Sequence, residues 1–250
     1  LWITHRVLFD CRLTIKPGLE LSTVHTEIIM FTGIIETTGS IKSISQIGGD
    51  IQLHIHAPDL DFSDVQLGDS IASNGICLTV VAIGNQSYAV DVSRETLSKS
   101  ALQNWRVGDI INLEKAMLPT TRFGGHIVAG HVDGVGVVRY MAKDARSIYI
   151  EIELPGELMR YTADKGSITV DGISLTTNAI KPDQNLVCLN IIPHTAERTN
   201  IDKHWSVGAL VNIEVDLVAR YLERLLLSKQ APQAVSSITE ETLAKAGFYL

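Results

Sequence analysis

The sequence predicts an all-β protein made of two similar six-stranded Greek-key β-barrels, followed by a C-terminal α-helix. The main observation is an internal duplication, because residues 69–80 (DSIASNGICLTV) recur as residues 166–177 (GSITVDGISLTT), at an offset of 97. Residues 105–114 recur in the same order as residues 205–214. Two copies with a period of about a hundred residues indicate a duplicated domain and not a solenoid. Two similar domains suggest two similar binding sites.

Short apolar runs between turn signals predict the strands of each barrel. Residues 51–56 (IQLHIH) alternate in polarity, and residues 148–154 (IYIEIEL) do so at the matching place in the second half. Many short strands favour a closed barrel, because closure removes exposed sheet edges. Residues 93–98 and 193–198 predict short helical turns. The other predicted strands are 71–73, 78–83, 88–92, 110–113, 168–170, 185–192 and 210–215.

The domains that we expect are an N-terminal barrel at residues 30–126, a C-terminal barrel at residues 127–216 and a helical segment at residues 217–250. The helix predicted at residues 217–229 has an apolar stripe, for which a partner subunit is the natural cover. A capping box at Ser237–Glu240 predicts a last short helix that stops at Gly247. The stripe consists of Val218, Tyr221, Leu222, Leu225 and Leu226.

Residues 1–29 lie outside the repeat, and the chain begins at Leu1. Charged residues interrupt each of their apolar runs, so we do not expect a signal peptide. We expect a non-homologous extension, either a disordered leader or a mis-called start, with Met30 opening the first repeat.

Composition excludes several classes of function. The chain has 250 residues and a net charge of −7, and it lacks the basic cluster that a nucleic-acid surface needs. No apolar run approaches the roughly 18–20 residues that cross a bilayer. Cys11, Cys77 and Cys188 show no spacing typical of a metal site or a disulfide framework, which favours the reducing cytoplasm.

Six motifs, in order along the chain, resemble riboflavin synthase of the alpha-chain type. This resemblance covers residues 30 to about 226 and implies a homotrimeric transferase, without metal or redox cofactor, that acts in riboflavin biosynthesis. Two molecules of 6,7-dimethyl-8-ribityllumazine would exchange a four-carbon unit, giving riboflavin and 5-amino-6-(D-ribitylamino)uracil. The motifs are MFTGII (30–35), SIASNGICLTV (70–80), ETL (95–97), GGHIVAGHVDG (124–134), KGSITVDGISLT (165–176) and VNIEVD (211–216).

The resemblance also implies that each barrel binds one lumazine, so that two substrates meet in each active site. That site would form between the N-terminal barrel of one subunit and the C-terminal barrel of its neighbour. An association with lumazine synthase is a further partner hypothesis. Neither nucleic acid nor a membrane is expected as a partner.

The resemblance carries four catalytic candidates over to this chain. Cys77 would contact the lumazine at the first barrel, with covalent attack and simple polarisation both open. His131 would act as an acid, a base or a polarising group, since its ordinary pKa lies near neutrality. Ser70 would bind the ring or only support a turn. Asp216 would cap the C-terminal helix, position a ligand or transfer a proton.

The expected ligand contacts also follow from the resemblance, and several of them differ between the repeats. Ser174 replaces the thiol of Cys77, and Lys165 could hold negative charge on the donor or be a solvated surface residue. We expect His126 to give structural support, and Phe31 to shield the ring. The substrate-binding set is Phe31, Gly33, Ile34, Ile35, Cys77, Leu78, Thr79, Asp91, Glu95, Thr96, Gly130, His131, Val132, Lys165, Ser174, Leu175, Thr176, Ile192, Pro193, His194, Thr195, Ala196 and Glu197.

Two other functions compete with this one. A non-catalytic lumazine- or flavin-binding fluorescent antenna protein would share the two barrels, but its second site would be degenerate, whereas this chain keeps the polar residues of both sites. A flavin-binding barrel of the ferredoxin-reductase kind would need a following nucleotide-binding α/β domain. No βαβ unit with a Gly-rich fingerprint follows in the sequence.

Overall fold

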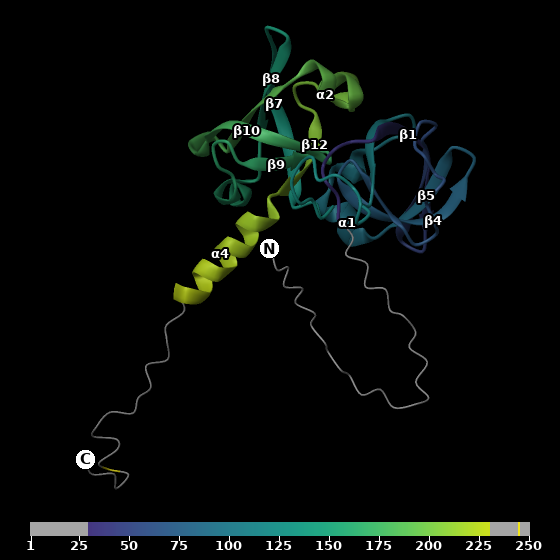
Figure 1. The fold of residues 1–250 in the computed structure, drawn as a ribbon, viewed down its shortest axis with the longest axis horizontal. Coiled ribbons are helices and arrows are strands. Elements are labelled where there is room, and N and C mark those ends of the chain that lie inside the picture. Colours follow the sequence, from purple (N-terminus) through teal and green to yellow (C-terminus); the bar gives the residue numbers. More distant parts are fainter. Residues whose placement is uncertain (1–29, 231–244, 246–250) are drawn as a thin grey trace, which may run out of the picture.

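The computed structural model describes residues 30–230 and residue 245. Within them the chain forms two closed β-barrels that lie side by side, and a long helix leaves the second barrel (Figure 1). The predicted fold class is confirmed. The expectations for residues 1–29 and for a helix opened by Ser237–Glu240 lie outside the described residues.

The first barrel contains six antiparallel strands in the spatial order β1-β2-β5-β4-β3-β6. Three consecutive hairpin strands (β3 to β5), followed by β6, which returns to lie beside β3, form the Greek-key pattern. Two short helices, α1 (Arg94–Lys99) and the 3₁₀ helix η1 (Ala101–Asn104), join β5 to β6. The strands are β1 (Thr37–Ile47), β2 (Asp50–His56), β3 (Ser70–Ser73), β4 (Ile76–Gly84), β5 (Ser87–Val92) and β6 (Ile110–Lys115).

The second barrel repeats this order with six new strands, as β10-β11-β8-β7-β12-β9. Its strands are β7 (Gly134–Asp144), β8 (Ser147–Glu153), β9 (Ser167–Val170), β10 (Ile173–Lys181), β11 (Leu186–Ile191) and β12 (Leu210–Val215). The short helices between the strands are η2 (Gly156–Tyr161), η3 (Pro182–Gln184), α2 (Pro193–Arg198) and α3 (Ile201–His204). The equal strand order in both barrels is the structural counterpart of the repeat.

The sequence pattern missed three strands, β1, β7 and β10. All three contain a break in register, between Ile41 and Ser43 in β1, between Val138 and Tyr140 in β7 and between Thr177 and Ala179 in β10. A β-bulge adds one residue to a strand, so the apolar positions beyond it change parity. The alternation that reveals a strand is therefore interrupted in all three. Strand β4 has a break as well, but its mostly apolar run at residues 78–83 predicted it without strict alternation. In β2, without such a break, Leu53 is buried as predicted.

The two barrels meet through the hairpin turns that follow β3 and β9. Asn74-Gly75 and Asp171-Gly172 have positive φ at both residues (45° and 77°, 46° and 81°), as type I′ turns require. A Cβ on Gly75 would lie 2.6 Å from the backbone nitrogen of Gly172. Only glycine fits there, because the two turns pack backbone against backbone across the pseudo-twofold axis.

Two buried asparagines reach from one barrel into the other. Asn112 Oδ1 accepts a hydrogen bond from the backbone nitrogen of Asn200 at 2.7 Å, and its Nδ2 donates to the carbonyl of Asp171 at 2.9 Å. Asn212 makes the matching pair with the amide of Ala101 (2.8 Å) and the carbonyl of the first turn (2.9 Å). Buried groups must keep such bonds, so these asparagines fix how the barrels are oriented.

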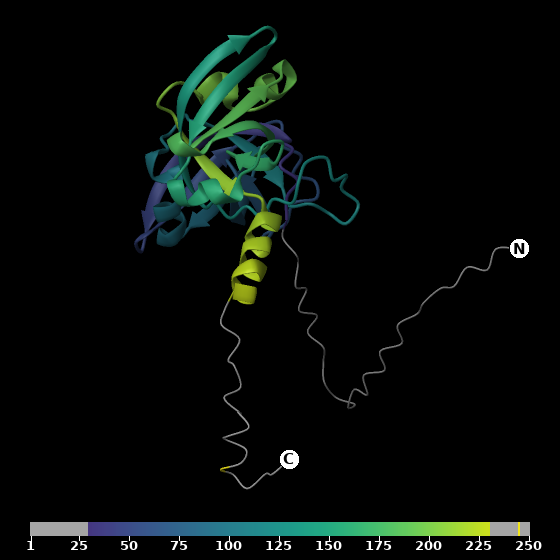
Figure 2. The ribbon, with the colours of Figure 1, turned by 90° about the vertical axis from the view of Figure 1, so that its left-hand side faces the viewer.

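The predicted C-terminal helix is α4 (Leu217–Gln230), which points away from both barrels (Figures 1 and 2). Its polar side is held to the second barrel, because Arg220 pairs with Asp133 and Glu223 accepts a hydrogen bond from the Tyr161 hydroxyl. The predicted apolar stripe is exposed by 54–65%. No helix in the described part of the chain is long and apolar enough to cross a membrane.

Candidate active site

Cys77 lies on the outer face of the first barrel, beside a small apolar cluster between the two barrels. Its cross-strand neighbour is Ala72, and Phe31 and Val128 complete the cluster against which Cys77 packs. Burial raises the pKa of the Cys77 thiol, so the uncharged thiol dominates near pH 7. In this environment Cys77 can contact and polarise a ring, whereas nucleophilic attack would need a base to form the thiolate.

Ser70 and Thr79 lie opposite each other on β3 and β4, next to Cys77. The Ser70 side chain is buried, and its Oγ has no hydrogen-bond partner in the described structure. Burial raises the pKa of the Cys77 thiol, and the Ser70 hydroxyl lowers it by a smaller amount. The Ser70 hydroxyl therefore acts on the Cys77 sulfur, and its oxygen is closed to solvent in the described structure.

Two segments cross from one barrel to the other before each barrel begins. The first crossing segment is residues 31–35 and the second is residues 128–132. Phe31 and Val128 pair in an antiparallel bridge, with N-to-O distances of 2.8 and 3.1 Å. Beyond the bridge, Ile35 packs against the core of the second barrel and Val132 packs against the core of the first. Each segment therefore leads into one barrel while it covers the other.

The crossing segments hold Cys77 and Ser174 in the same way. The carbonyl of Gly130 accepts a hydrogen bond from the Cys77 nitrogen at 2.9 Å, and that of Gly33 accepts one from the Ser174 nitrogen at 2.8 Å. A Cβ on either glycine would lie 2.6 Å from the Cβ of its partner, and both have φ near +75°. The two glycines are required because the backbone touches the two candidate side chains directly.

A buried glutamate anchors each crossing segment. The Glu114 carboxylate accepts bonds from the backbone nitrogens of Thr32 (2.7 Å) and Gly33 (2.9 Å) and from the Thr32 hydroxyl. Glu214 accepts from three backbone nitrogens, at residues 129–131, at 2.6–3.1 Å. Burial raises the pKa of both groups to about 7, and these hydrogen bonds limit the rise. Sequence reasoning missed both residues as part of the site.

Ser174 sits in a more polar environment than Cys77. His126 is almost fully buried, and its Nδ1 lies 2.7 Å from Ser174 Oγ, while its Nε2 lies 3.1 Å from Thr169 Oγ1. Burial lowers the pKa of His126, and the charge of Asp216 opposes this effect. His126 thus contacts Ser174 directly, and its expected role as structural support stays a prediction. Asp216 Oδ1 also accepts a bond from the Val218 nitrogen at 2.9 Å, as a helix cap does.

Comparison with known proteins decides the family. The lumazine binding domain matches twice, at residues 32–116 and 129–216. A riboflavin synthase of Photobacterium phosphoreum is 50% identical over 221 residues, which cover 88% of this chain and 100% of that protein. The riboflavin synthase of Bacillus subtilis (strain 168) is 40% identical over 219 residues, again covering 88% of this chain and 100% of that protein.

The chain belongs to the riboflavin synthase family. Solved structures agree on the fold. The crystal structure of LumP complexed with 6,7-dimethyl-8-(1'-D-ribityl) lumazine has a TM-score of 0.67 and 24% identity, and covers 74% of this chain and 99% of that one. The complex of LumP with riboflavin has a TM-score of 0.68 at 25% identity, with the same coverage.

His131 lines a cavity of about 230 Å³ at the start of α4. Asp133 and Arg220 form an ion pair at this cavity, and Asp133 Oδ2 accepts a bond from the Val215 nitrogen at 2.8 Å. Burial raises the pKa of Asp133, and Arg220 opposes the rise. His131 follows directly after Gly130, which touches Cys77, but its own side chain is exposed. Its role in a riboflavin synthase site therefore stays a prediction.

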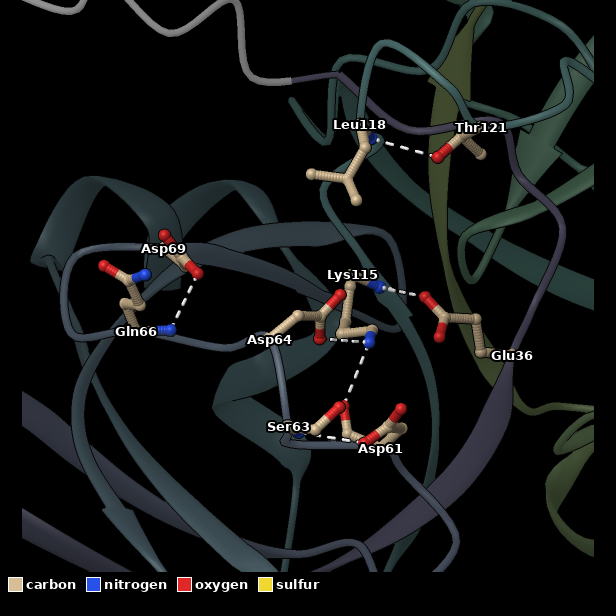
Figure 3. A network of polar contacts seen from close by, with 9 residues as sticks. All are labelled: Glu36, Asp61, Ser63, Asp64, Gln66, Asp69, Lys115, Leu118 and Thr121. Carbon is tan, nitrogen blue, oxygen red and sulfur yellow. Dashed lines mark hydrogen bonds and ion pairs between the residues drawn. The ribbon is translucent and has the colours of Figure 1, made fainter.

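The equivalent corner of the first barrel is built around Lys115 (Figure 3). Glu36 accepts a bond from the Lys115 nitrogen at 2.7 Å, just as Asp133 does from Val215. The Lys115 ammonium group bonds Asp64 at 2.6 Å and the carbonyl of Asp61 at 2.9 Å. In the first barrel this lysine and a loop lie where the second barrel has α4. The two regions therefore share the bond from a carboxylate to the strand backbone and differ in what surrounds it.

The remaining predicted contacts divide by their place on the barrels. Thr79 and Asp91 are exposed on β4 and β5 of the first barrel, and Thr176 is exposed on β10 of the second. Leu78 is buried in the first core, and Leu175 packs against the second core. Further predicted contacts that are exposed at the surface include Ile34, Lys165, Glu95 and His194. The predicted turns with Thr96 and with Pro193, Thr195, Ala196 and Glu197 are α1 and α2, and Ile192 precedes α2.

The residues that sequence reasoning missed had a signal in the repeat. Asn112 and Glu114 recur as Asn212 and Glu214, at the common offset of 100. Polar residues at alternate positions of an apolar strand point away from the barrel core. Their recurrence at the same positions in both halves marked the face on which the barrels contact each other.

Proposed function

We propose that this chain is a riboflavin synthase that binds two molecules of 6,7-dimethyl-8-ribityllumazine, one at each barrel. A four-carbon unit passes from one to the other, giving riboflavin and 5-amino-6-(D-ribitylamino)uracil. Curated relatives at 40–50% identity carry this name, and the lumazine binding domain occurs twice in the chain. Holding both reactants in a fixed geometry can contribute about 7–11 kcal/mol to catalysis.

One observation carries the proposal: two equivalent positions share the same backbone support but present different chemical groups. Cys77 and Ser174 are each held by the carbonyl of a crossing-segment glycine. One site has a thiol beside an unpaired hydroxyl, and the other has a hydroxyl bonded to an imidazole. A dismutation needs this difference, because one substrate molecule must donate the carbon unit and the other must accept it.

We assign the acceptor to the first barrel and the donor to the second. At the first barrel Cys77 and Ser70 contact the acceptor ring, and His131 serves as an acid, base or polarising group. At the second barrel Ser174 and Thr176 contact the donor. Two observations support these assignments. The crossing segments hold both sites through backbone hydrogen bonds, and Ser174 has polar neighbours. No metal or redox cofactor takes part in this proposal.

We further propose that the active protein is a homotrimer in the cytoplasm. The exposed apolar stripe of α4, with Leu222 and Leu225 at its centre, supports an interface there, because large exposed apolar patches mark interaction surfaces. Each active site would form between the first barrel of one subunit and the second barrel of its neighbour. An association with lumazine synthase would place the enzyme beside the source of its substrate.

The test is an incubation of the purified protein with the lumazine alone. Riboflavin absorbance and the uracil product should appear in equal amounts, since the dismutation yields one of each. The alternative is a lumazine-binding protein without activity, as in an antenna. It would bind the ligand with a change in fluorescence and form neither product, which would overturn the proposal.

A further inference from the structure

Glu214 belongs to the second barrel, but the segment that it holds leads to the candidate site of the first barrel. Its carboxylate accepts hydrogen bonds from the backbone nitrogens of Ala129 (2.6 Å), Gly130 (3.0 Å) and His131 (3.1 Å). The carbonyl of Gly130 in turn accepts the bond from the Cys77 nitrogen. One buried carboxylate is therefore only two hydrogen bonds away from the thiol residue of the other barrel.

The contact between Gly130 and Cys77 leaves little room for this segment to shift. A Cβ on Gly130 would lie 2.6 Å from the Cβ of Cys77 and 2.9 Å from Cε2 of Phe31. The backbone nitrogen of Cys77 would lie 3.0 Å from the same point. Because the segment touches Cys77 at its backbone and at Cβ, a change at the carboxylate that holds the segment changes where the sulfur lies.

The negative charge of Glu214 also acts on the thiol. Burial is the main cause of the raised pKa of Cys77, the Ser70 hydroxyl opposes the rise, and the charge of Glu214 adds to it. Two like charges repel each other, so an ionised Glu214 disfavours the thiolate and favours the neutral thiol. This effect reaches from the second barrel to a side chain of the first.

Glu214 itself changes its charge in the neutral range. Burial raises its pKa to about 7, the charge of Asp133 adds to the rise, and the three backbone bonds oppose it. Asp133, His131 and Arg220 line the same cavity as Glu214, and Arg220 pairs with Asp133. Well below pH 7 the carboxyl group of Glu214 is mostly neutral and should have little effect on the sulfur. Well above pH 7 it is charged and should oppose the thiolate.

The equivalent anchor in the other half of the chain holds a residue of a different kind. Glu114 accepts a bond from the Gly33 nitrogen, and the Gly33 carbonyl accepts the bond from the Ser174 nitrogen. A serine hydroxyl does not ionise in the neutral range, so a nearby carboxylate does not change its protonation state. The same backbone support can therefore control the protonation of the thiol at one site but has no such effect at the other.

We propose that Glu214 is a positioning residue for the first-barrel site, which holds Gly130 against Cys77 and whose negative charge keeps the thiol uncharged. This inference rests on the proposed function only in taking Cys77 as a contact of the ligand. An uncharged thiol is a weak hydrogen-bond donor, whereas the thiolate is the nucleophile. The second barrel would thus set the form in which the first barrel presents its sulfur to the ligand.

The experiment measures the reaction of Cys77 with 4,4′-dithiodipyridine on the full-length protein at pH 5.5 and pH 8.5, by the absorbance of the released thiopyridone. The kinetic phase that Cys77→Ser lacks is the phase of Cys77. In Glu214→Gln this phase should be about three- to tenfold faster than in the parent at pH 8.5, since one pKa unit changes the thiolate fraction about tenfold. At pH 5.5 the two rates should be equal, because Glu214 is then neutral in the parent as well.

Glu157→Gln is the matched control, since this glutamate is exposed at the start of η2, and it should keep the parent's rates at both pH values. Equal rates in Glu214→Gln and the parent at pH 8.5 would overturn the inference. A variant that is faster by the same factor at both pH values would also overturn it, because the segment would then be loosened without an effect of charge.

If Glu214→Gln shows no cooperative thermal transition, the pH profile of the parent decides. The logarithm of its Cys77 rate should rise by less than one unit per pH unit between pH 6 and pH 8, because Glu214 gains its charge in this range. A slope of one throughout would overturn the inference. A parent that forms no riboflavin would contradict the proposed function, and these thiol rates would still test the role of Glu214.

Discussion

The two buried glutamates make the stability of the protein depend on pH in a way that can be calculated. Burial raises the pKa of Glu114 and Glu214 from 4.5 to about 7. The charge of Glu36 adds to the rise at Glu114, and that of Asp133 adds to it at Glu214. Because the folded pKa lies above the unfolded one, the native state binds more protons between these values. This contribution to stability is fully present below about pH 4.5 and is lost as the pH rises through 7.

The size of the effect follows from the two pKa values. For one group that shifts from 4.5 to about 7, the free energy of unfolding falls by roughly 1.4 kcal/mol between pH 6 and pH 9. The pair together gives a fall of roughly 3 kcal/mol over the same range. His126 acts in the opposite direction, because its lowered pKa makes the unfolded state the better proton acceptor near pH 6. The measured profile is therefore the sum of opposing contributions, and only variants separate them.

The perturbation is Glu114→Gln, Glu214→Gln and the double substitution. Glutamine cannot titrate, so each substitution should remove about 1.4 kcal/mol of pH dependence between pH 6 and 9. Above about pH 7, where the parent groups are carboxylates, each variant should also lose a hydrogen bond, because the new amide group faces a backbone N–H that the carboxylate accepted. The assay is urea unfolding followed by tryptophan fluorescence, with the free energy extrapolated to water at each pH. Glu157→Gln, on the exposed start of η2, is the matched control.

The change in the free energy of unfolding with pH, compared between the parent and the variants, can refute this reasoning. A double variant whose stability changes with pH as steeply as that of the parent would show that the two carboxylates stay charged throughout. In that case the six donors that they accept would outweigh burial, and their pKa values would lie in the ordinary range or below it. A steeper slope in the control variant would show instead that surface groups dominate the profile.

Three further predictions concern the site and the assembly. Cys77→Ser should bind lumazine nearly as the parent does and slow turnover if sulfur takes part, while His131→Gln should lower kcat by about 10²–10⁴, both read from single-turnover kinetics with ligand titration. Gly130→Ala should cost about 1–3 kcal/mol more stability than Gly68→Ala, because both have positive φ but only the first Cβ meets Cys77; equal urea midpoints would contradict this. Truncation after Asp216 should yield monomers with little activity, and sedimentation of an active trimer would exclude α4 as the interface.

Much of the fold could be predicted from the repeat, because the residues that favour a local structure are also those that pack in the barrels. Asn74-Gly75 and Asp171-Gly172 stand at equivalent positions of the repeat, and the structure has type I′ turns at both. The helical stripe after Asp216 predicted α4 to within one residue at its C-terminal end. Strands β1, β7 and β10 were not predicted, because a bulge breaks the alternation on which strand prediction depends.

The site was only partly accessible from the sequence. The repeat aligned Cys77 with Ser174, and the contacts confirm that the two are held alike. The crossing of residues 31–35 and 128–132 could not be predicted, since a local pattern does not tell which barrel a connecting segment will cover. The hydrogen-bond partners of Glu114 and Glu214 could not be predicted for the same reason, because they lie more than 80 residues away in sequence.

The exchange of crossing segments explains how one duplicated frame can carry two different sites. Gly33 and Gly130 are the same residue type in both halves because the backbone contacts leave no room for a side chain, and Glu114 and Glu214 both accept hydrogen bonds from the backbone of these segments. Cys77 and Ser174 share the Cβ that approaches the glycine backbone and differ only beyond it, in the sulfur and the hydroxyl oxygen. A change such as thiol to hydroxyl therefore alters the chemistry of one site without altering the shape of either. Because the backbone is fixed in the same way at both sites, the side chains of the two sites can differ without a change in the fold.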